Sequence, residues 1–351
     1  MIRHLSSVLT TWLTKRRSTD LRTLEIAEEL GVTEGELVAS ACGASGELVA
    51  TRLRGAPVEL LGELSVLGPM KAITRNRDAV LEVDGAYAEL ELFEHTGRVA
   101  GEIDLRLSPG RWRHVFSLRE ESKRGPRVSL QFFDDAGAAL HEAHATAETD
   151  HEALEELIER RTAANQSPTM PVERPPSPPP TRPDDAIDVA GLRAAWRAMK
   201  DTHELLDLLR RFEVGRRQAL RLLGPDFARP ASPKALEKTL ADVAAASVPI
   251  MIFVGNPGLI QIWSGPVRRL VPRDGWVHVL DPTLDLRVRE DRIDNAWVVR
   301  KPTDTGVVTA LEVYSGEELT TLIVGKRRPG DAENEAWRRI VVDAPAPEVT
   351  R

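Results

Sequence analysis

The sequence predicts an α+β protein made of two copies of one unit, and two observations support this fold class. Segments with helical periodicity open each half, and strand-like runs rich in β-branched residues then follow one another without intervening helices. Motifs of the first half also recur in the second half at a constant displacement. Because strands in such succession pair antiparallel, each half is expected to form a large antiparallel β-sheet with flanking helices.

The duplication rests on matching motifs whose positions differ by 181 residues. The matches are Ile103–Leu107 with Leu284–Val288, Phe116 with Trp297, Gly125 with Gly306, and Ser129–Phe133 with Ala310–Tyr314. A register kept through so many positions is not expected by chance. With two long copies, the chain is a paired-domain protein and not a solenoid.

A proline-rich segment separates the two copies. Eight prolines fall between residues 168 and 183, and almost no large apolar residue accompanies them. Such a composition favours an extended, polyproline-like linker that does not pack. We therefore predict a first repeat at 1–164, a linker at 165–188 and a second repeat at 189–345.

The first element is expected to be an amphipathic helix. Residues 1–19 contain no acidic residue, and Ile2, Leu5, Leu9 and Trp12 recur at helical spacing. This composition is also typical of transit peptides. The helical pattern continues in the next segment, which favours a structural helix and leaves the cytoplasm as the expected compartment.

The remaining helices follow the same order in each half. In the first half they are expected at 21–30, 34–41 and 57–67, with a closing helix at 152–161; in the second half they are expected at 192–212, 216–222 and 233–246, with a closing helix at 332–341. Thr33 and Glu36 form a capping box that starts the second of these helices.

The strands lie between these helices. They include runs at 88–93, 113–118 and 128–133 in the first half, and at 249–254, 259–263, 276–280, 296–300 and 307–314 in the second half. Gly125 and Gly306 mark hairpin turns. The strand succession argues against a Rossmann fold or a TIM barrel, and the sequence has no glycine-rich phosphate loop.

Composition excludes several classes of function. The chain has 351 residues and a formal net charge of −7, which argues against a general nucleic-acid binder. Its one cysteine, Cys42, excludes an internal disulfide and a cysteine-rich metal cluster. No apolar run approaches the ~18 residues of a membrane-spanning helix.

Three local patterns bear on the kind of site that the chain could hold. Residues 27–37 resemble a helix-turn-helix, but the second helix is acidic, so an αα-hairpin is favoured. His141, His144 and His151 lie near acidic residues and suggest a metal site; a solvated strand end is favoured, because no established ligand motif is present. The chain also lacks the nucleophile elbow of α/β-hydrolases.

His203 is the strongest candidate for chemistry. The expected helix 192–212 places five residues on one face, namely Leu192, Trp196, Met199, His203 and Leu206, so the imidazole should be shielded from water. Nearby cations are Arg210, Arg211, Arg216, Arg217, Lys301, Lys326, Arg327 and Arg328, with Arg106 in the first half. A haem requires an apolar face, an axial nitrogen and cations for its propionates. A core histidine bonded to a backbone carbonyl is the alternative.

Several longer motifs support the haem hypothesis. They are Met199–His203, Leu208–Arg211, Arg216–Ala219, Ile252–Asn256, Ile260–Ile262, Trp297–Thr303 and Gly325–Arg327 in the second half, and Gly101–Leu107 and Arg124–Phe133 in the first half. With these motifs the chain resembles the haemin-degrading, haem-trafficking family of HemS/ChuX type over nearly its whole length outside the linker.

The resemblance implies two homologous halves that hold one haem b between them as cargo or substrate. It implies that His203 is the axial iron ligand and that Arg106 is the distal arginine. It assigns propionate or pocket contacts to Arg216, Lys301 and Arg327. Family members receive haem that a membrane importer delivers, and they pass it to a haem oxygenase or open the ring themselves.

The chain departs from the family pattern at a few positions. Glu204, Leu205 and Leu206 follow the candidate ligand where aromatic residues are common, Val324 replaces another aromatic residue, and Leu259 stands where a cysteine is common. We expect a cytoplasmic haem-binding protein of haem uptake, trafficking and iron acquisition. The alternatives are a haem-degrading monooxygenase and a paired-domain interaction protein that binds no haem.

Overall fold

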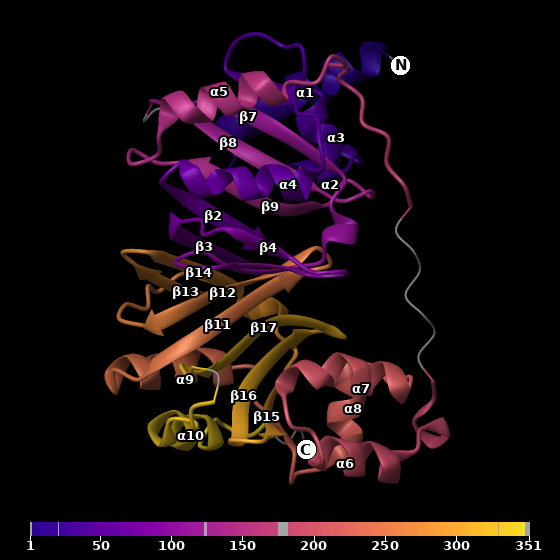
Figure 1. Cartoon of the computed structure of the whole chain (residues 1–351), viewed down its shortest axis with the longest axis vertical. Helices are drawn as coiled ribbons and strands as arrows, with labels where there is room; N and C mark the ends of the chain where they lie inside the picture. Colours follow the sequence, from indigo (N-terminus) through magenta and orange to yellow (C-terminus); the bar gives the residue numbers. More distant parts are fainter. Residues whose placement is uncertain (1, 20, 123–124, 175–181, 329, 348–351) are drawn as a thin grey trace. The chain divides into compact units, whose positions relative to one another are not determined.

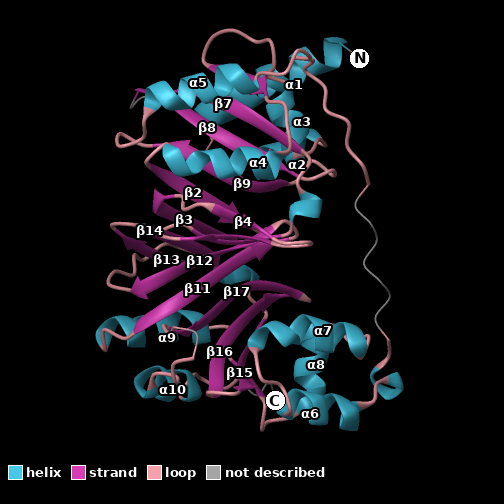
Figure 2. Ribbon diagram, in the orientation of Figure 1, coloured by secondary structure: helices cyan, strands magenta, loops and turns pink. Residues whose placement is uncertain are grey.

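The computed structural model describes residues 2–19, 21–122, 125–174, 182–328 and 330–347. The chain forms two compact units (Figure 1). Unit 1 comprises residues 1–75, 82–176 and 255–261, and unit 2 comprises residues 76–81, 177–254 and 262–351. Both units combine antiparallel strands with helices, which confirms the predicted fold class (Figure 2).

The helices of unit 1 lie mostly before and after its strands. They are α1 Ile2–Ser18, α2 Thr23–Leu30, α3 Glu34–Ala39, α4 Pro57–Gly62 and α5 His151–Arg161, with the 3₁₀ turns η1 Glu63–Val66 and η2 Pro109–Arg111. Thr33 and Glu36 form the predicted capping box of α3. Gly31 ends α2 with a φ of 67°, a left-handed conformation that favours glycine.

The main sheet of unit 1 has the order β1-β7-β8-β9-β2-β3. Its strands are β1 Leu48–Arg52, β2 Pro69–Arg75, β3 Ala79–Ala86, β7 His114–Ser122, β8 Gly125–Phe133 and β9 Ala139–Ala145. A second antiparallel group comprises β4 Leu90–Leu92, β5 Gly97–Ala100 and β6 Asp104–Leu107. An ion pair between Arg119 and Glu155 joins β7 to α5, which lies over this sheet (Figure 1).

The helices of unit 2 include a group that precedes its strands. They are α6 Val189–Arg197, α7 Leu205–Arg211, α8 Arg216–Leu223, α9 Ala235–Ala245 and α10 Glu335–Val342, with the 3₁₀ turns η3 Asp184–Ala186, η4 Thr202–Glu204 and η5 Glu290–Arg292. The indole of Trp196 donates to the carbonyl of Arg300 at 2.9 Å, which fixes α6 to the adjacent sheet.

The main sheet of unit 2 repeats the order of unit 1, as β10-β15-β16-β17-β11-β12. Its strands are β10 Ala228–Ala231, β11 Pro249–Asn256, β12 Leu259–Pro266, β15 Asn295–Thr303, β16 Gly306–Ser315 and β17 Glu318–Gly325. The hairpin of β13 Trp276–Asp281 and β14 Leu284–Arg289 corresponds to β5 and β6. The shared strand order supports the duplication that the motifs predict.

The predicted helix 192–212 is wrong as a single element, because the chain breaks it after Arg197. Asp201 has extended backbone angles and its carboxylate caps η4. The carboxylate of Glu204 accepts from the backbone N–H of Asp201 at 3.0 Å. These side chains satisfy backbone groups that a continuous helix would use, so a short 3₁₀ turn and a separate α7 replace it.

The proline-rich segment packs at both ends, contrary to expectation. Arg52 donates to the carbonyls of Ser167 at 3.1 Å and Thr169 at 2.7 Å, and Met170 is buried in the core of unit 1. In unit 2, Gln218 bonds Asp184 at 2.8 Å. The most proline-rich stretch of the predicted linker, residues 175–181, lies outside the described residues.

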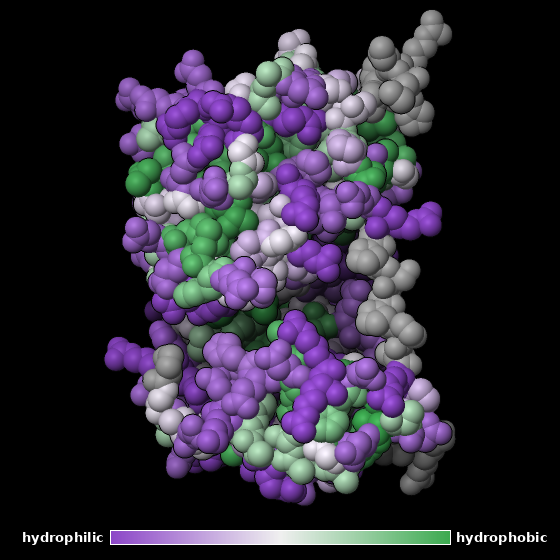
Figure 3. Space-filling model, turned by 45° about the vertical axis from the view of Figure 1, so that its right-hand side comes forward, coloured by the Kyte–Doolittle hydropathy of each residue, from purple (hydrophilic) through white to green (hydrophobic). Residues whose placement is uncertain are grey.

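Each unit has its own apolar core. The core under the helices of unit 1 includes Trp12, Leu37 and Phe116, and the core of unit 2 includes Trp196, Leu220 and Tyr314. Polar side chains cover much of the surface in Figure 3, with apolar ones in small groups between them. No helix in the described part of the chain combines the length and apolar character of a membrane span.

Candidate functional site

His203 lies in η4 and is exposed to solvent. Its side chain is 88% exposed, so the expectation that an apolar helix face shields it is wrong. The imidazole Nδ1 lies 2.6 Å from Oδ1 of Asp201, and the backbone N–H of His203 donates to the same oxygen at 2.8 Å. With Nδ1–H donated to the carboxylate, Nε2 carries the free lone pair that a metal ion requires.

Asp201 is a site residue that the sequence interpretation missed. The backbone N–H of His203 holds the pKa of Asp201 below its usual value, and the His203 imidazole and Arg327 contribute to the same shift. Asp201 therefore remains a carboxylate at neutral pH. The available signal was an aspartate two positions before a histidine at a helix start, where a carboxylate caps the helix.

The apolar stripe around His203 divides between core and surface. Leu192, Trp196 and Met199 pack in the core of unit 2, whereas the side chain of Leu206 is 57% exposed. The break after α6 rotates the second part of the stripe out of the core. Leu206 and His203 are therefore both exposed on the surface of unit 2.

A buried ion cluster joins two of the predicted cationic residues. Arg216 on α8 donates to Glu312 on β16 through Nε at 2.9 Å and Nη2 at 2.7 Å. Lys301 on β15 donates to Oε1 of the same carboxylate at 2.6 Å, and the Tyr314 hydroxyl donates to Oε2 at 2.6 Å. Glu312 is fully buried, so this carboxylate draws three side chains together.

The charges in this cluster shift one another's ionisation. Burial alone would raise the pKa of Glu312, but Arg216 and Lys301 hold it well below its usual value. Burial lowers the pKa of Lys301, and the charge of Glu312 partly opposes this shift. Sequence reasoning missed Glu312, although it is the only charged residue of the apolar strand 306–315.

Arg327 follows β17 and belongs to the same unit as His203. Its positive charge makes a small contribution to the lowered pKa of Asp201. The structure gives Arg327 no side-chain hydrogen bond or ion pair within the described residues. Its contact with a ligand stays a prediction.

Arg106 belongs to unit 1, where it lies on β6. Its guanidinium pairs with the carboxylate of Asp104 and donates to the Leu105 carbonyl at 3.0 Å. The side chain is 39% exposed. Part of its donor surface is thus accessible, and its contact with a ligand stays a prediction.

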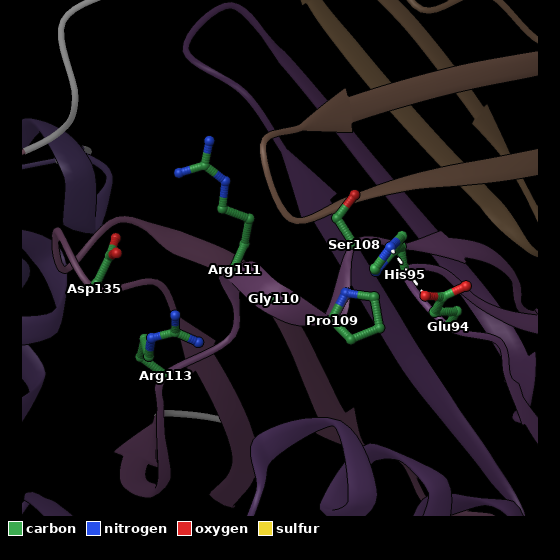
Figure 4. A pocket seen from close by; sticks show the side chains of 8 residues that line it. All are labelled: Glu94, His95, Ser108, Pro109, Gly110, Arg111, Arg113 and Asp135. Atoms are coloured by element: carbon green, nitrogen blue, oxygen red, sulfur yellow. Dashed lines mark ion pairs between the residues drawn. The ribbon is translucent and has the colours of Figure 1, made fainter. Parts of the chain in front are cut away.

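Unit 1 also contains an open pocket of about 470 Å³ that none of the predicted site residues lines (Figure 4). Its lining consists of Glu94, His95, Ser108, Pro109, Gly110, Arg111, Arg113 and Asp135. Trp112, which lies between Arg111 and Arg113 in the sequence, is buried, and its indole donates to the Gly258 carbonyl at 3.0 Å. Two arginines and two carboxylates share this lining, so the pocket has no marked preference for either sign of charge.

His141 differs from the solvated strand end that the sequence suggested. It is buried, with Nδ1 at 2.9 Å from the Thr74 hydroxyl and Nε2 at 2.7 Å from the Tyr87 hydroxyl. Burial lowers the pKa of His141 to about 3, so the ring is neutral. Across the described ranges, no group of three or more His, Cys, Asp or Glu side chains is arranged to hold a metal ion.

Comparisons with known proteins agree with this architecture. The model of the haemin-degrading HemS/ChuX domain matches residues 31–160 and 213–343. The hemin transport protein HemS of Yersinia enterocolitica is 36% identical over 320 residues, which cover 90% of each chain. HmuS of Yersinia pestis, also a hemin transport protein, is 36% identical over 321 residues, again 90% of each chain.

Solved structures extend the comparison to the fold. Holo-PhuS, a heme-binding protein from Pseudomonas aeruginosa, has a TM-score of 0.93 and 38% identity, with 97% of this chain and 99% of that chain covered. The heme degrading enzyme ChuS of Escherichia coli has a TM-score of 0.88 and 33% identity, with the same coverage of 97% and 99%.

Proposed function

Because the chain belongs to the haemin-degrading HemS/ChuX domain family, we propose that it binds haem in the cytoplasm and carries it from an importer to a haem oxygenase. The observation that carries this proposal is the geometry of His203. Its imidazole is exposed, and Asp201 holds Nδ1 at 2.6 Å, so that Nε2 is free to bind iron.

The cations of unit 2 suit the acidic edge of haem. The charge of Arg327 acts on Asp201, and the Arg216 side chain is partly exposed and shares the Glu312 carboxylate with Lys301. Guanidinium and ammonium groups are the usual partners of carboxylates such as the two propionates. Arg106 of unit 1 would add a permanently charged hydrogen-bond donor toward the haem, since an arginine does not lose its proton near neutral pH.

Titration with haemin tests this function. Purified full-length protein is expected to bind one haemin per chain and to shift the Soret band, because an imidazole nitrogen replaces a solvent ligand on the iron. Absorption spectroscopy at micromolar protein measures both the spectrum and the stoichiometry. An unchanged haemin spectrum at a saturating ratio would leave the proposal without support and would favour a paired-domain protein that binds no haem.

Haem degradation is the second candidate, because a heme degrading enzyme covers 97% of this chain at 33% identity. The haem itself would supply the oxygen chemistry, and the protein would supply position and polarity. The haemin complex can be mixed with ascorbate in the presence of catalase. Steady formation of a defined open-chain tetrapyrrole would favour degradation, whereas a stable Soret band would favour delivery.

A further inference from the structure

The carboxylate of Glu312 is surrounded by donors from three separate elements. Arg216 approaches from α8, Lys301 from β15 and Tyr314 from β16 itself, all at 2.6–2.9 Å. Both oxygens of Glu312 accept two donors each. Neither oxygen of the carboxylate therefore has room for a further donor, and the carboxylate fixes the side-chain positions of Lys301 and Arg216.

Lys301 and Arg216, by contrast, keep hydrogen-bond donors that Glu312 does not occupy. Lys301 is 5% exposed, and its ammonium group makes one hydrogen bond out of three, within the described residues. Arg216 commits Nε and Nη2 to Glu312, which leaves Nη1 on a side chain that is 25% exposed. The open donors of the buried Lys301 ammonium are costly unless another acceptor completes them.

The charge of the cluster is also incomplete. Two cations share one carboxylate, and the described part of the chain gives neither of them a second acidic partner. A surplus positive charge in a buried cluster favours an anionic group from outside the protein. One carboxylate would neutralise the surplus and accept the open hydrogen bonds.

We propose that Glu312 is the positioning residue for a propionate of the bound haem, because it keeps Lys301 charged and Arg216 oriented toward that carboxylate. This inference rests on the proposed haem-binding function. It deepens that function by assigning to one buried acid the control of two predicted haem contacts. Glu312 itself acts through these cations and does not touch the ligand.

Removing the Glu312 charge is expected to make haemin binding depend on pH. The charged and titratable groups of the cluster are Lys301, Glu312, Tyr314 and Arg216. Burial lowers the pKa of Lys301 and the charge of Glu312 opposes this shift, whereas Arg216 does not lose its proton. Replacing Glu312 by glutamine removes the negative charge that supports the Lys301 ammonium. Lys301 then becomes neutral at a lower pH, and binding of a carboxylate weakens as the pH rises.

Haemin binding by the full chain tests this inference. Glu312→Gln is expected to lower the haemin affinity about tenfold above neutral pH, with partial recovery as the pH falls toward 7, while the wild type keeps a nearly constant affinity. Haemin dimethyl ester is the second probe, because its carboxylates are blocked. The ester should bind wild type and Glu312→Gln with equal affinity through His203.

Glu333→Gln is the matched control. Glu333 is another buried carboxylate of unit 2, but it bonds Thr309 and Arg338 and none of the cluster cations. It should leave haemin affinity and its pH profile unchanged. Equal losses in both variants, or a loss that persists with the dimethyl ester, would overturn the positioning role.

The outcomes separate this role from the proposed function. If the wild type binds neither haemin nor its dimethyl ester, haem binding itself fails. If both ligands bind and Glu312→Gln matches the wild type, only the positioning role fails. Should Glu312→Gln not fold, Lys301→Gln tests the same contact: its affinity for haemin must fall, and its affinity for the ester must not.

Discussion

Replacing His203 by alanine is expected to lower haemin affinity by about 100-fold or more and to remove the shifted Soret band. This loss of affinity is larger than the ~10–100-fold cost of losing an outer-shell partner of a metal ligand, because alanine removes the ligand nitrogen itself. His203 is 88% exposed, so the substitution leaves no cavity in the core and should not change the thermal stability. Absorption titration and a melting curve measure the two effects.

Two comparison variants define the origin of this loss. Asp201→Asn keeps the imidazole but replaces the carboxylate that holds Nδ1 at 2.6 Å, so affinity should fall about tenfold with the Soret band retained. His95→Ala removes an exposed histidine of unit 1 and should alter neither quantity. A wild-type spectrum in His203→Ala would assign the iron ligand to another residue.

The fold was predictable because a repeated register carries information about whole strands. The match of Ser129–Phe133 with Ala310–Tyr314 falls on β8 and β16, which occupy equivalent places in the two sheets. Alternation of buried residues and glycine turns identifies single strands, and duplication shows which strands are equivalent. Leu48–Arg52, a five-residue strand between α3 and α4, was not among the named strands, because so short a run does not distinguish a strand from a helix.

The candidate site was less predictable, because local side-chain bonds override helical periodicity. A spacing of three and four residues placed His203 on the same face as Trp196, but the chain leaves the helix between them. Asp201 and Glu204 decide this by bonding backbone groups of the turn. Helical periodicity considers the spacing of apolar residues and not side-chain hydrogen bonds that compete with the helix. It therefore predicted a shielded histidine where the structure has an exposed one.

Glu312 was not recognisable as a site residue in the sequence for a different reason. In sequence it is one acid in an apolar strand, 11 residues from Lys301 and 96 residues from Arg216. Its significance arises only when α8 and β15 bring both cations to one carboxylate. The family resemblance named the cations as ligand contacts, whereas the structure adds that they share a buried counter-ion.

The second large effect concerns acid stability through His141. Its folded-state pKa is about 3 because of burial, and an unfolded histidine has a pKa of about 6.5. Below pH 6.5 the unfolded state therefore binds a proton that the native state excludes. Stability from this group is full at pH 7 and is lost as the pH falls, by about 2 kcal/mol at pH 5, and the loss is complete near pH 3.

Urea unfolding of wild type and His141→Gln at pH 7 and pH 5 isolates this contribution. Glutamine keeps hydrogen-bonding capacity beside Thr74 and Tyr87, but it cannot take up a proton in this range. The variant should be less stable than the wild type at pH 7, since the ring contacts with Trp112 and Phe132 are lost, yet it should lose about 2 kcal/mol less between the two pH values.

His95→Gln, at an exposed position, should keep the wild-type pH dependence. Because acidic groups titrate in all three proteins, their contributions cancel in the comparison. An equal pH dependence in wild type and His141→Gln would mean that the native protein admits the proton on His141 or opens locally to do so.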